Sequence, residues 1–298
     1  MPKVDVIIPA YNAEKYLATA LDSVLAQSFE DWRIVLVDDG SSDATAAVVA
    51  PYVERLGSRI SFIQQPNLGV SAARNTAIRN SSGEFLALLD ADDVWLPDRL
   101  LESLKSFDGR PQIGLTYGFN TRIGPDGTVI DTFDRRQRHG EGWIAPYLYM
   151  RRIDLPAPTI TFRRQCIEEV GVFDETLRVT EDRDLWLRIA SRYQVALVPK
   201  VLALYRTSPD SATTDPDRML RSQLQFIEKH YGSPGCGWLA RRAALSQIYR
   251  QRAEALGHRG QLCVALTSSL RALALDPLCV GNARSAASLL LRCAGIKR

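Results

Sequence analysis

The chain has 298 residues, of which 46% are hydrophobic and 24% charged, which is enough to build a substantial core in one large domain or two. The net charge of +3 is uneven, because residues 1–215 hold 24 Lys and Arg against 30 Asp and Glu, whereas residues 216–298 hold 13 against 4. We therefore expect an acidic catalytic domain over residues 1–215, followed by a basic helical extension over residues 216–298.

The five cysteines contain no CxxC pair, so the sequence predicts neither a zinc site nor a disulfide framework. The start of the chain passes directly into a strand pattern and does not resemble a signal peptide. Apolar runs stay well short of the ~20 residues that a membrane helix needs. The expected location is the cytoplasm, with peripheral contact to the inner face of a membrane as an additional option.

The first third of the chain alternates between apolar strand patterns and amphipathic helix patterns. Strands are predicted at 4–9, 32–37, 60–63 and 85–89, and helices at 17–25, 44–54 and 70–80. Asn12 is expected to cap the first of these helices. Such alternation predicts βαβ units, and therefore an α/β fold with a mostly parallel sheet.

Polar turns follow three of these strands, at 9–12, 38–41 and 90–93. Ligands of parallel sheets bind beyond the carboxyl ends of the strands, so the three turns are expected to be neighbours. In the third turn, Asp90, Asp92 and Asp93 bring like charges together, which predicts a divalent cation that would also bind substrate phosphates. The alternative is that these acids only form an Asx-type turn and cap the next helix.

Several enzyme classes lack their sequence signature here. The first turn, residues 9–13, contains no glycine, which argues against dinucleotide binding, and the GxGxxA match at 235–240 follows no predicted strand. A Walker A loop, a GxSxG elbow and an HExxH pair are also missing from the sequence. The sequence thus disfavours hydride transfer and the chemistries that these motifs mark.

The rest of the chain has a less regular pattern. Further strands are predicted at 113–117, 128–130, 195–198 and 201–205, with a turn at 124–127. A helix is expected to begin near Thr180 or Asp182, where acidic side chains favour the positive end of the helix dipole. The basic segment 134–140 fits a solvated loop, with contact to phosphate or an acidic acceptor as the alternative. In the tail, 253–257 and 265–275 fit one tetratricopeptide-style helical hairpin, which is too little for a repeat array.

Six short motifs occur in order between residues 3 and 210. They are VIIPAYN at 6–12, VDDGSSD at 37–43, NLGVSAARN at 67–75, LDADD at 89–93, GVFDE at 171–175 and EDRDLW at 181–186. Through these motifs the chain resembles the family-2 inverting glycosyltransferases of the GT-A fold. The resemblance implies a GT-A, Rossmann-like α/β domain, with the C-terminal helices as an addition outside it.

The resemblance also implies roles in binding a nucleotide-sugar donor. Pro9 and Tyr11 would flank the nucleotide base. Asp39 would accept hydrogen bonds from the base, and Arg74 would also face it. A packing role for the Tyr11 ring is the alternative. Asp38 is expected to brace its turn.

In the same family, Asp90 and Asp92 would form the DxD element. Asp90 would lie near the ribose or the metal, and Asp92 would be the direct ligand of Mn²⁺ or Mg²⁺. Many members carry a histidine where this chain has Ser208, and a hydroxyl is a poorer ligand for a transition metal than imidazole is. We expect either a looser grip on the metal or positive charge from Arg206 at the donor.

Asp182 matches the family's general base, which would deprotonate the acceptor hydroxyl. The implied function is the transfer of a hexose-type sugar from a nucleotide-sugar donor, expected to be UDP-linked, to a saccharide, lipid-linked or protein acceptor with inversion. The QxxRW element of processive polysaccharide synthases is missing, which favours single additions within polysaccharide biosynthesis. No nucleic-acid partner is expected.

Two other functions compete with this hypothesis. A nucleotidyltransferase of similar fold would need a basic, glycine-rich loop near the first strand, and residues 9–13 do not supply one. A catalytically silent nucleotide-sugar-binding or scaffold protein could act through its helical tail. The end of that tail, from Leu289 onward, fits either an anionic membrane surface or packing against the catalytic domain.

Overall fold

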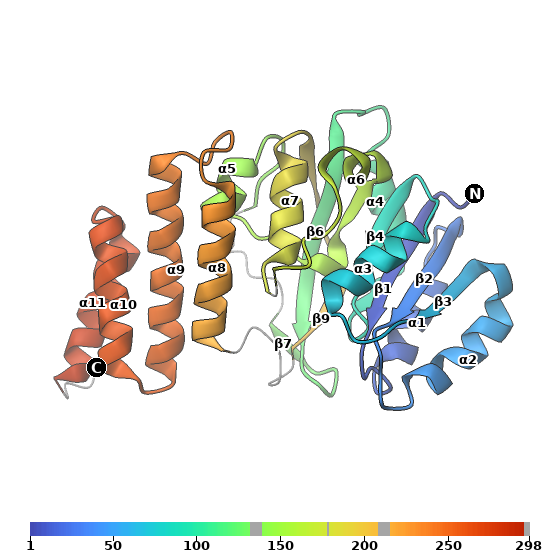
Figure 1. Ribbon diagram of the computed structural model, residues 1–298, viewed down its shortest axis with the longest axis horizontal. Coiled ribbons are helices and arrows are strands. Elements are labelled where there is room, and N and C mark those ends of the chain that lie inside the picture. The colour runs from blue at the N-terminus through green and yellow to red at the C-terminus, as the bar shows by residue number, and fades with distance from the viewer. Residues whose placement is uncertain (132–138, 178, 208–214, 295–298) are drawn as a thin grey trace. The chain divides into compact units, whose positions relative to one another are not determined.

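The chain forms two compact units in a computed structural model that describes residues 1–131, 139–177, 179–207 and 215–294 (Figure 1). One unit comprises Met1–Ile144 and Asp154–Ser208, and the other comprises Ala145–Ile153 and Pro209–Arg298. The sequence predicted a single boundary at residue 215. The units instead interleave along the chain, because a short segment in the middle packs with the C-terminal helices.

The first unit is built on one sheet, which has nine strands in the described residues and the order β3-β2-β1-β4-β8-β6-β9-β5, with β7 paired to β6. The strands are β1 (Val4–Ala10), β2 (Trp32–Asp38), β3 (Ile60–Gln64), β4 (Phe85–Leu88), β5 (Val94–Trp95), β6 (Ile113–Ile123), β7 (Val129–Asp131), β8 (Thr161–Arg163) and β9 (Gln194–Arg206). Its helices are α1 (Leu17–Leu25), α2 (Thr45–Leu56), α3 (Val70–Arg79), α4 (Arg99–Lys105), α6 (Arg164–Val170) and α7 (Glu181–Ala190), with 3₁₀ turns η1 (Gly57–Arg59) and η2 (Ala157–Thr159).

The half of the sheet formed by β3, β2, β1 and β4 is entirely parallel. Every residue of β1 and β4 is buried, as expected for strands that are covered on both faces. Helix α1 buries Leu17, Ala20, Leu21 and Val24, the spacing that its sequence predicted. The βαβ interpretation of the first third of the chain is therefore confirmed.

The other half of the sheet is mixed, because β8 is antiparallel to both β4 and β6. The two strands predicted at 195–198 and 201–205 are one strand, β9, which pairs in parallel with β6. Between them, Pro199 and Lys200 have no partner in the register, since Gly118 pairs with Val198 and Phe119 with Val201. Proline cannot donate to a ladder, so the strand bulges there and continues.

One predicted helix cap is wrong. Helix α1 begins at Leu17, after Tyr16, and Asn12 lies too early in the chain to cap it. Asn12 instead has a φ of 47° and connects two turns: its N–H donates to Ser41 Oγ (2.9 Å), and its Oδ1 accepts from the N–H of Ser42 (2.9 Å). Asparagine tolerates this left-handed conformation better than most residues do.

The second unit is helical and contains α5 (Ala145–Tyr149), α8 (Pro216–His230), α9 (Trp238–His258), α10 (Leu262–Leu275) and α11 (Val280–Cys293). Helices α9 and α10 form the predicted hairpin and pack against each other along much of their length. Leu289 of α11 is buried in a small core with Ala253, Leu256 and Ala265. Leu289 is therefore packed inside the protein and does not face a membrane surface. Its partners belong to α9 and α10, whereas the sequence predicted packing against the catalytic domain.

The five cysteines are free thiols in this structure. No helix in the described part of the chain combines the length and the apolar character that crossing a bilayer requires.

Candidate active site

The turns after β1 and β2 lie side by side, as the sequence predicted. The N–H of Asp39 donates to the carbonyl of Ala10 at the end of β1 (2.8 Å). The bonds between Asn12 and Ser41 or Ser42 tie the same two turns together. Gly40 has a φ of +75°, and a Cβ there would lie 2.7 Å from the backbone nitrogen of Asn67, so the turn requires glycine.

Asp38 and Asp39 are both buried but have different surroundings. Asp38 braces its turn, as predicted: its carboxylate accepts from the N–H of Ser41 (3.0 Å) and from Gln64 Nε2 (3.1 Å). Asp39 accepts from Gln65 Nε2 (2.7 Å) and from the N–H groups of Leu68 (3.0 Å) and Gly69 (2.8 Å). A carboxylate has about four acceptor positions, so Asp39 keeps capacity for one further donor such as a base N–H.

Pro9 and Tyr11 lie on either side of the end of β1. Pro9 is buried within the strand, whereas the side chain of Tyr11 projects from the turn and is 54% exposed. Tyr11 therefore does not belong to the core, and its ring is accessible to a ligand.

The third turn carries the three aspartates and is held by Arg206 at the end of β9. The N–H of Arg206 donates to Asp93 Oδ1 (2.8 Å), and its guanidinium donates to the carbonyls of Asp92 (2.9 Å) and Gly124 (3.0 Å). The guanidinium also stacks on the ring of Tyr16, with 4.3 Å from Cζ to the centroid. Arg206 thus places a fixed positive charge beside the acids while bracing their backbone.

The acids nevertheless keep an excess of negative charge. Burial, and then the charge of Asp90, raises the pKa of Asp92 to about 6. The same two causes raise the pKa of Asp93 well above its ordinary value, and its buried Oδ2 has no partner among the described residues. Uncompensated carboxylates of this kind attract a cation.

The residues present fit a divalent metal ion. In the described part of the chain, no three His, Cys, Asp or Glu side chains form a ready metal cage. Mg²⁺ and similar ions need only one or two carboxylates when substrate phosphates and water supply the other ligands. Asp90 and Asp92, both partly exposed, could supply those carboxylates.

Arg74, on α3, connects this acidic turn to α7. Its Nη2 lies 2.7 Å from Asp90 Oδ1, and its Nη1 lies 3.1 Å from Glu181 Oε1. The guanidinium is buried, which by itself would lower its pKa, but Asp90 and Glu181 outweigh that effect and raise the pKa above its ordinary value. Two segments 91 positions apart in sequence, at 90 and 181, therefore share one buried cation.

Asp182 follows Glu181 in the first turn of α7. Burial, and then the charge of Glu181, raises the pKa of Asp182 to about 7. The phenol of Tyr205 has its own pKa raised to about 12, first by burial and then by Asp93, Asp90 and Asp92, with a further contribution from Asp182. Both groups of acids therefore lie within electrostatic range of one phenol.

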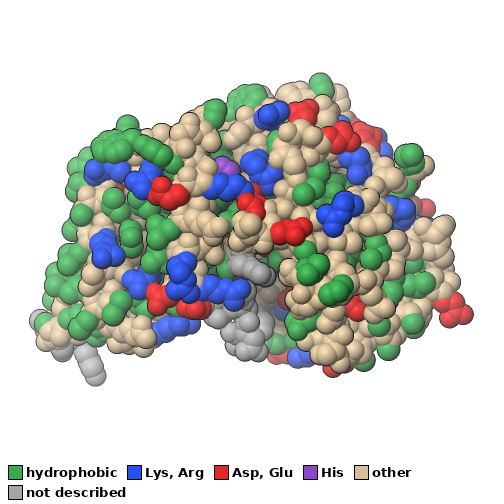
Figure 2. Space-filling model, viewed as in Figure 1, with side chains coloured by type: hydrophobic (Ala, Val, Ile, Leu, Met, Phe, Trp, Pro, Cys, Tyr) green, Lys and Arg blue, Asp and Glu red, His purple; other side chains and the backbone are tan. Residues whose placement is uncertain are grey.

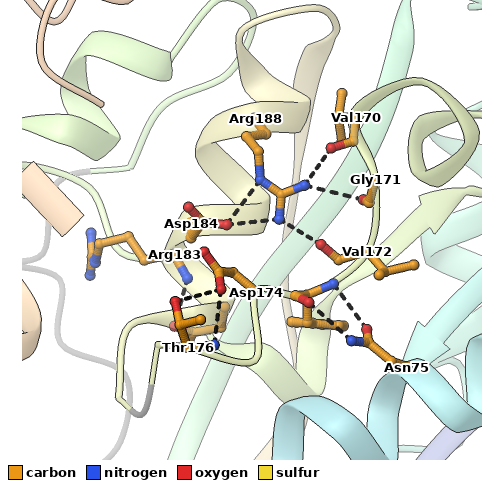
Figure 3. A network of polar contacts seen from close by, with 11 residues as sticks. Asn75, Val170, Gly171, Val172, Asp174, Thr176, Arg183, Asp184 and Arg188 are labelled. Atoms are coloured by element: carbon orange, nitrogen blue, oxygen red, sulfur yellow. Dashed lines mark hydrogen bonds and ion pairs between the residues drawn. The ribbon is translucent and has the colours of Figure 1, made fainter. Parts of the chain in front are cut away.

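The start of α7 is held in place by a polar network that includes Arg188 and Asn75 (Figure 3). Arg188 pairs with the buried carboxylate of Asp184 (2.7 Å) and donates to the carbonyls of Val170 (2.5 Å) and Val172 (2.7 Å). Asn75 exchanges two hydrogen bonds with the backbone of Phe173, both of 3.0 Å. Asp184 is thus the buried ion-pair partner of Arg188.

Sequence reasoning missed Glu181, because an acid in a first helical turn is explained by the helix dipole alone. The pairing with Arg74 depends on a contact between residues 107 positions apart. Tyr16 was also missed. Ser208 and most of the basic segment 134–140 lie outside the described residues.

A family model for "Glycosyl transferase family 2" matches residues 5–167, which is more than half of the chain. An uncharacterized glycosyltransferase of Nostoc sp. is 29% identical over 238 residues, covering 76% of this chain and 74% of that protein. The uncharacterized glycosyltransferase EpsJ of Bacillus subtilis is 29% identical over 267 residues, covering 79% of this chain and 72% of that protein.

Solved structures share the fold. The mannosyltransferase PcManGT from Pyrobaculum calidifontis, in complex with GDP-Man and Mn²⁺, aligns with a TM-score of 0.66 at 20% identity, covering 99% of this chain and 80% of that one. Residues 1–349 of S. aureus TarS align with a TM-score of 0.64 at 17% identity, covering 98% and 92%. The predicted GT-A-like α/β fold with a C-terminal helical region is confirmed. With its family model matched over more than half of its length, the chain belongs to glycosyltransferase family 2.

Proposed function

We propose that this protein is an inverting, metal-assisted glycosyltransferase that transfers one sugar at a time from a UDP-linked donor to an acceptor hydroxyl. Membership of family 2 supports a transferase that uses a nucleotide sugar. One structural neighbour was solved with UDP and with UDP-GlcNAc, and another with GDP-Man and Mn²⁺. These neighbours support the donor class and a divalent metal.

The observation that carries the proposal is the double ion pair of Arg74. Because Arg74 contacts Asp90 on one side and Glu181 on the other, one buried cation connects the third turn to the first turn of α7. A donor diphosphate beside Asp90 and Asp92 would therefore lie close to Asp182.

Asp182 is the proposed general base. A carboxylate with a pKa of about 7 is half ionised near neutral pH and is a stronger proton acceptor than an ordinary aspartate. In the proposed reaction it accepts the proton of the acceptor hydroxyl, whose oxygen attacks the anomeric carbon opposite the leaving nucleoside diphosphate. Attack from that face inverts the anomeric configuration.

Donor binding is assigned to the three turns. Tyr11 and Pro9 would flank the base, and Asp39 would accept from it. Arg74, which the family resemblance assigned to the base, would instead hold Asp90 in place beside the donor, and Arg206 would add positive charge. A divalent ion held by Asp90 and Asp92 would neutralise charge that develops on the leaving diphosphate.

Replacement of Asp182 by Asn tests the mechanism. General-base catalysis contributes about 10²- to 10⁴-fold, so kcat should fall by about that factor, while calorimetric binding of UDP-sugar with Mn²⁺ stays nearly unchanged. The exposed Asp108→Asn serves as a matched control and should keep full activity. Full activity of Asp182→Asn would overturn the base assignment.

Donor hydrolysis separates an enzyme from the silent binder considered above. A glycosyltransferase should hydrolyse its nucleotide sugar slowly when Mn²⁺ is added without an acceptor. If a panel of nucleotide sugars stabilises the fold but none is hydrolysed or transferred, the silent-binder alternative is correct.

A further inference from the structure

Large apolar side chains are exposed together at one end of the helical unit, where α9 begins and α10 passes into α11. We call Trp238, Leu239, Leu278 and Val280 the end patch; they are 58%, 75%, 91% and 63% exposed, respectively. Figure 2 shows hydrophobic side chains gathered at the upper left, over the ends of these helices, with Lys and Arg directly beside them.

Arg242 shows that the two parts of the end patch belong to the same end of the unit. It projects from the first turns of α9, stacks on the ring of Trp238 with 4.9 Å from Cζ to the centroid, and donates to the carbonyl of Leu275 (2.9 Å). Leu275 is the last residue of α10 and is three positions before Leu278. Asn282 then fixes the start of α11 by donating to Ser246 Oγ (2.8 Å).

The end patch does not contribute to the core of its unit. A small buried cluster of the unit, Ala253, Leu256, Ala265 and Leu289, lies further along the helices. Single exposed apolar residues need no explanation, but a group of large ones on a protein surface marks an interaction site.

The surroundings of the end patch are basic. Arg241 stacks on the exposed Tyr231 and Arg242 on Trp238, and Arg284 is exposed one turn after Val280. Residues 216–298 hold 13 Lys and Arg against 4 Asp and Glu. At this end, Glu228 pairs with Arg241 and Asp276 lies two positions before Leu278, so the two remaining arginines, Arg242 and Arg284, exceed the one remaining acid.

We propose that the end patch docks on the surface of an anionic lipid bilayer. Tryptophan favours the interface between headgroups and acyl chains, and leucine side chains partition below it. The exposed Arg284 can extend to a lipid phosphate, and each cation near an anionic leaflet adds to the attraction. A second copy of the chain would instead bring two positively charged patches together, which disfavours self-association through this end.

Co-sedimentation of the full-length protein with vesicles tests the proposal. The protein should sediment with vesicles of phosphatidylcholine mixed with phosphatidylglycerol, and much less with phosphatidylcholine alone. The double variant Leu239→Ser/Leu278→Ser should bind the mixed vesicles at least about tenfold more weakly, because it loses two apolar side chains that insert. Arg284→Gln should weaken binding to mixed vesicles only.

Two matched variants test whether the loss of any exposed apolar side chain would weaken vesicle binding. Ile130→Ser, in the other unit, and Leu290→Ser, on α11, remove side chains that are 55% and 51% exposed and should leave binding unchanged. All these side chains are exposed, so melting temperatures should stay at the wild-type value.

Three results would overturn the proposal. The first is that the protein sediments with neither kind of vesicle. The second is that the end-patch variants bind vesicles as the wild type does. The third is that sedimentation velocity shows a dimer that the double variant abolishes, which would make a second copy of the chain the occupant of the patch.

Discussion

Glu181 has opposite effects on its two charged neighbours. It forms an ion pair with Arg74, and its negative charge raises the pKa of Asp182. A proposed general base needs a raised pKa, whereas the donor side of the site needs Arg74 held in place. A single carboxylate can therefore tune the base and orient the cation.

Glu181→Gln should shift the pH profile of the reaction. As the proposed base, Asp182 would act as a carboxylate, so the rate should fall as pH drops through its pKa of about 7. Without the charge of Glu181 that pKa decreases, and the acid limb of kcat moves to lower pH. The measurement is kcat between about pH 5 and 9. The acid limb of that profile gives the pKa of the base in the enzyme–substrate complex. An exposed acid, Glu168→Gln, provides the control; an unmoved limb in Glu181→Gln would refute the electrostatic role.

Asp92→Asn should stabilise the metal-free protein. The pKa of Asp92 is raised to about 6, so the folded state binds more protons than the unfolded state, and stability falls as pH rises from about 4 to 6. Asn removes this penalty and should add about 1–3 kcal/mol to the free energy of unfolding near pH 8, with no gain below about pH 4. Urea unfolding in EDTA measures the gain, with Asp108→Asn as control.

Added metal and donor should reverse the order of stability of the wild type and Asp92→Asn. Mn²⁺ with UDP-sugar should stabilise the wild type by mass action and leave Asp92→Asn almost unaffected. Equal metal-dependent stabilisation of both would place the metal elsewhere.

At the scale of elements, α7 is positioned both by a buried apolar face, which includes Leu185, Trp186 and Ile189, and by polar side chains. Arg188 joins the helix to the carbonyls of Val170, at the end of α6, and Val172, and Asn75 joins α3 to the Gly171–Glu175 segment (Figure 3). These contacts determine where the first turn of α7, and hence Asp182, lies.

Arg188→Ala should be strongly destabilising. It leaves the fully buried Asp184 without this cation, and breaking a buried pair in this way costs about 3–5 kcal/mol. Arg188→Lys should recover only part of the loss, because an ammonium cannot reproduce the planar fork that bonds Asp184 and the carbonyls together. Chemical denaturation measures both variants, and the 59% exposed side chain of Arg192, changed to Ala, is the control. A loss below about 1 kcal/mol in Arg188→Ala would contradict the role of the network.

At the scale of the whole molecule, the residues proposed to bind the donor all belong to the unit built on the sheet. Hydrogen exchange with and without UDP-sugar and Mn²⁺ should therefore show slower exchange after β1, β2 and β4 and at the start of α7. A bound ligand slows exchange only where local unfolding would disrupt the binding site. Exchange in α10 and α11 should therefore stay unchanged. Equal protection of α10 and α11 would show that the donor site extends to the helical unit.

The sequence by itself determined the parallel half of the sheet, the neighbouring polar turns and the family. Each of these depends on local patterns: apolar runs with strand or helix period, and short motifs directly after them. The helical hairpin of the tail could be predicted for the same reason. The sequence predicts two strands where β9 is one, because Pro199 is a local signal for interruption, whereas pairing with β6 continues the strand past it.

Only the tertiary structure decided which charges meet. The pairing of Arg74 with Asp90 and Glu181 and the raised pKa of Asp182 arise from side chains that are distant in sequence and share a buried space. Asn12 bonds across to the second turn instead of capping α1 because folding brings Ser41 and Ser42 to it. Local propensity could not reveal these contacts, since burial and distance set the strength of a charge interaction and both exist only in the folded chain.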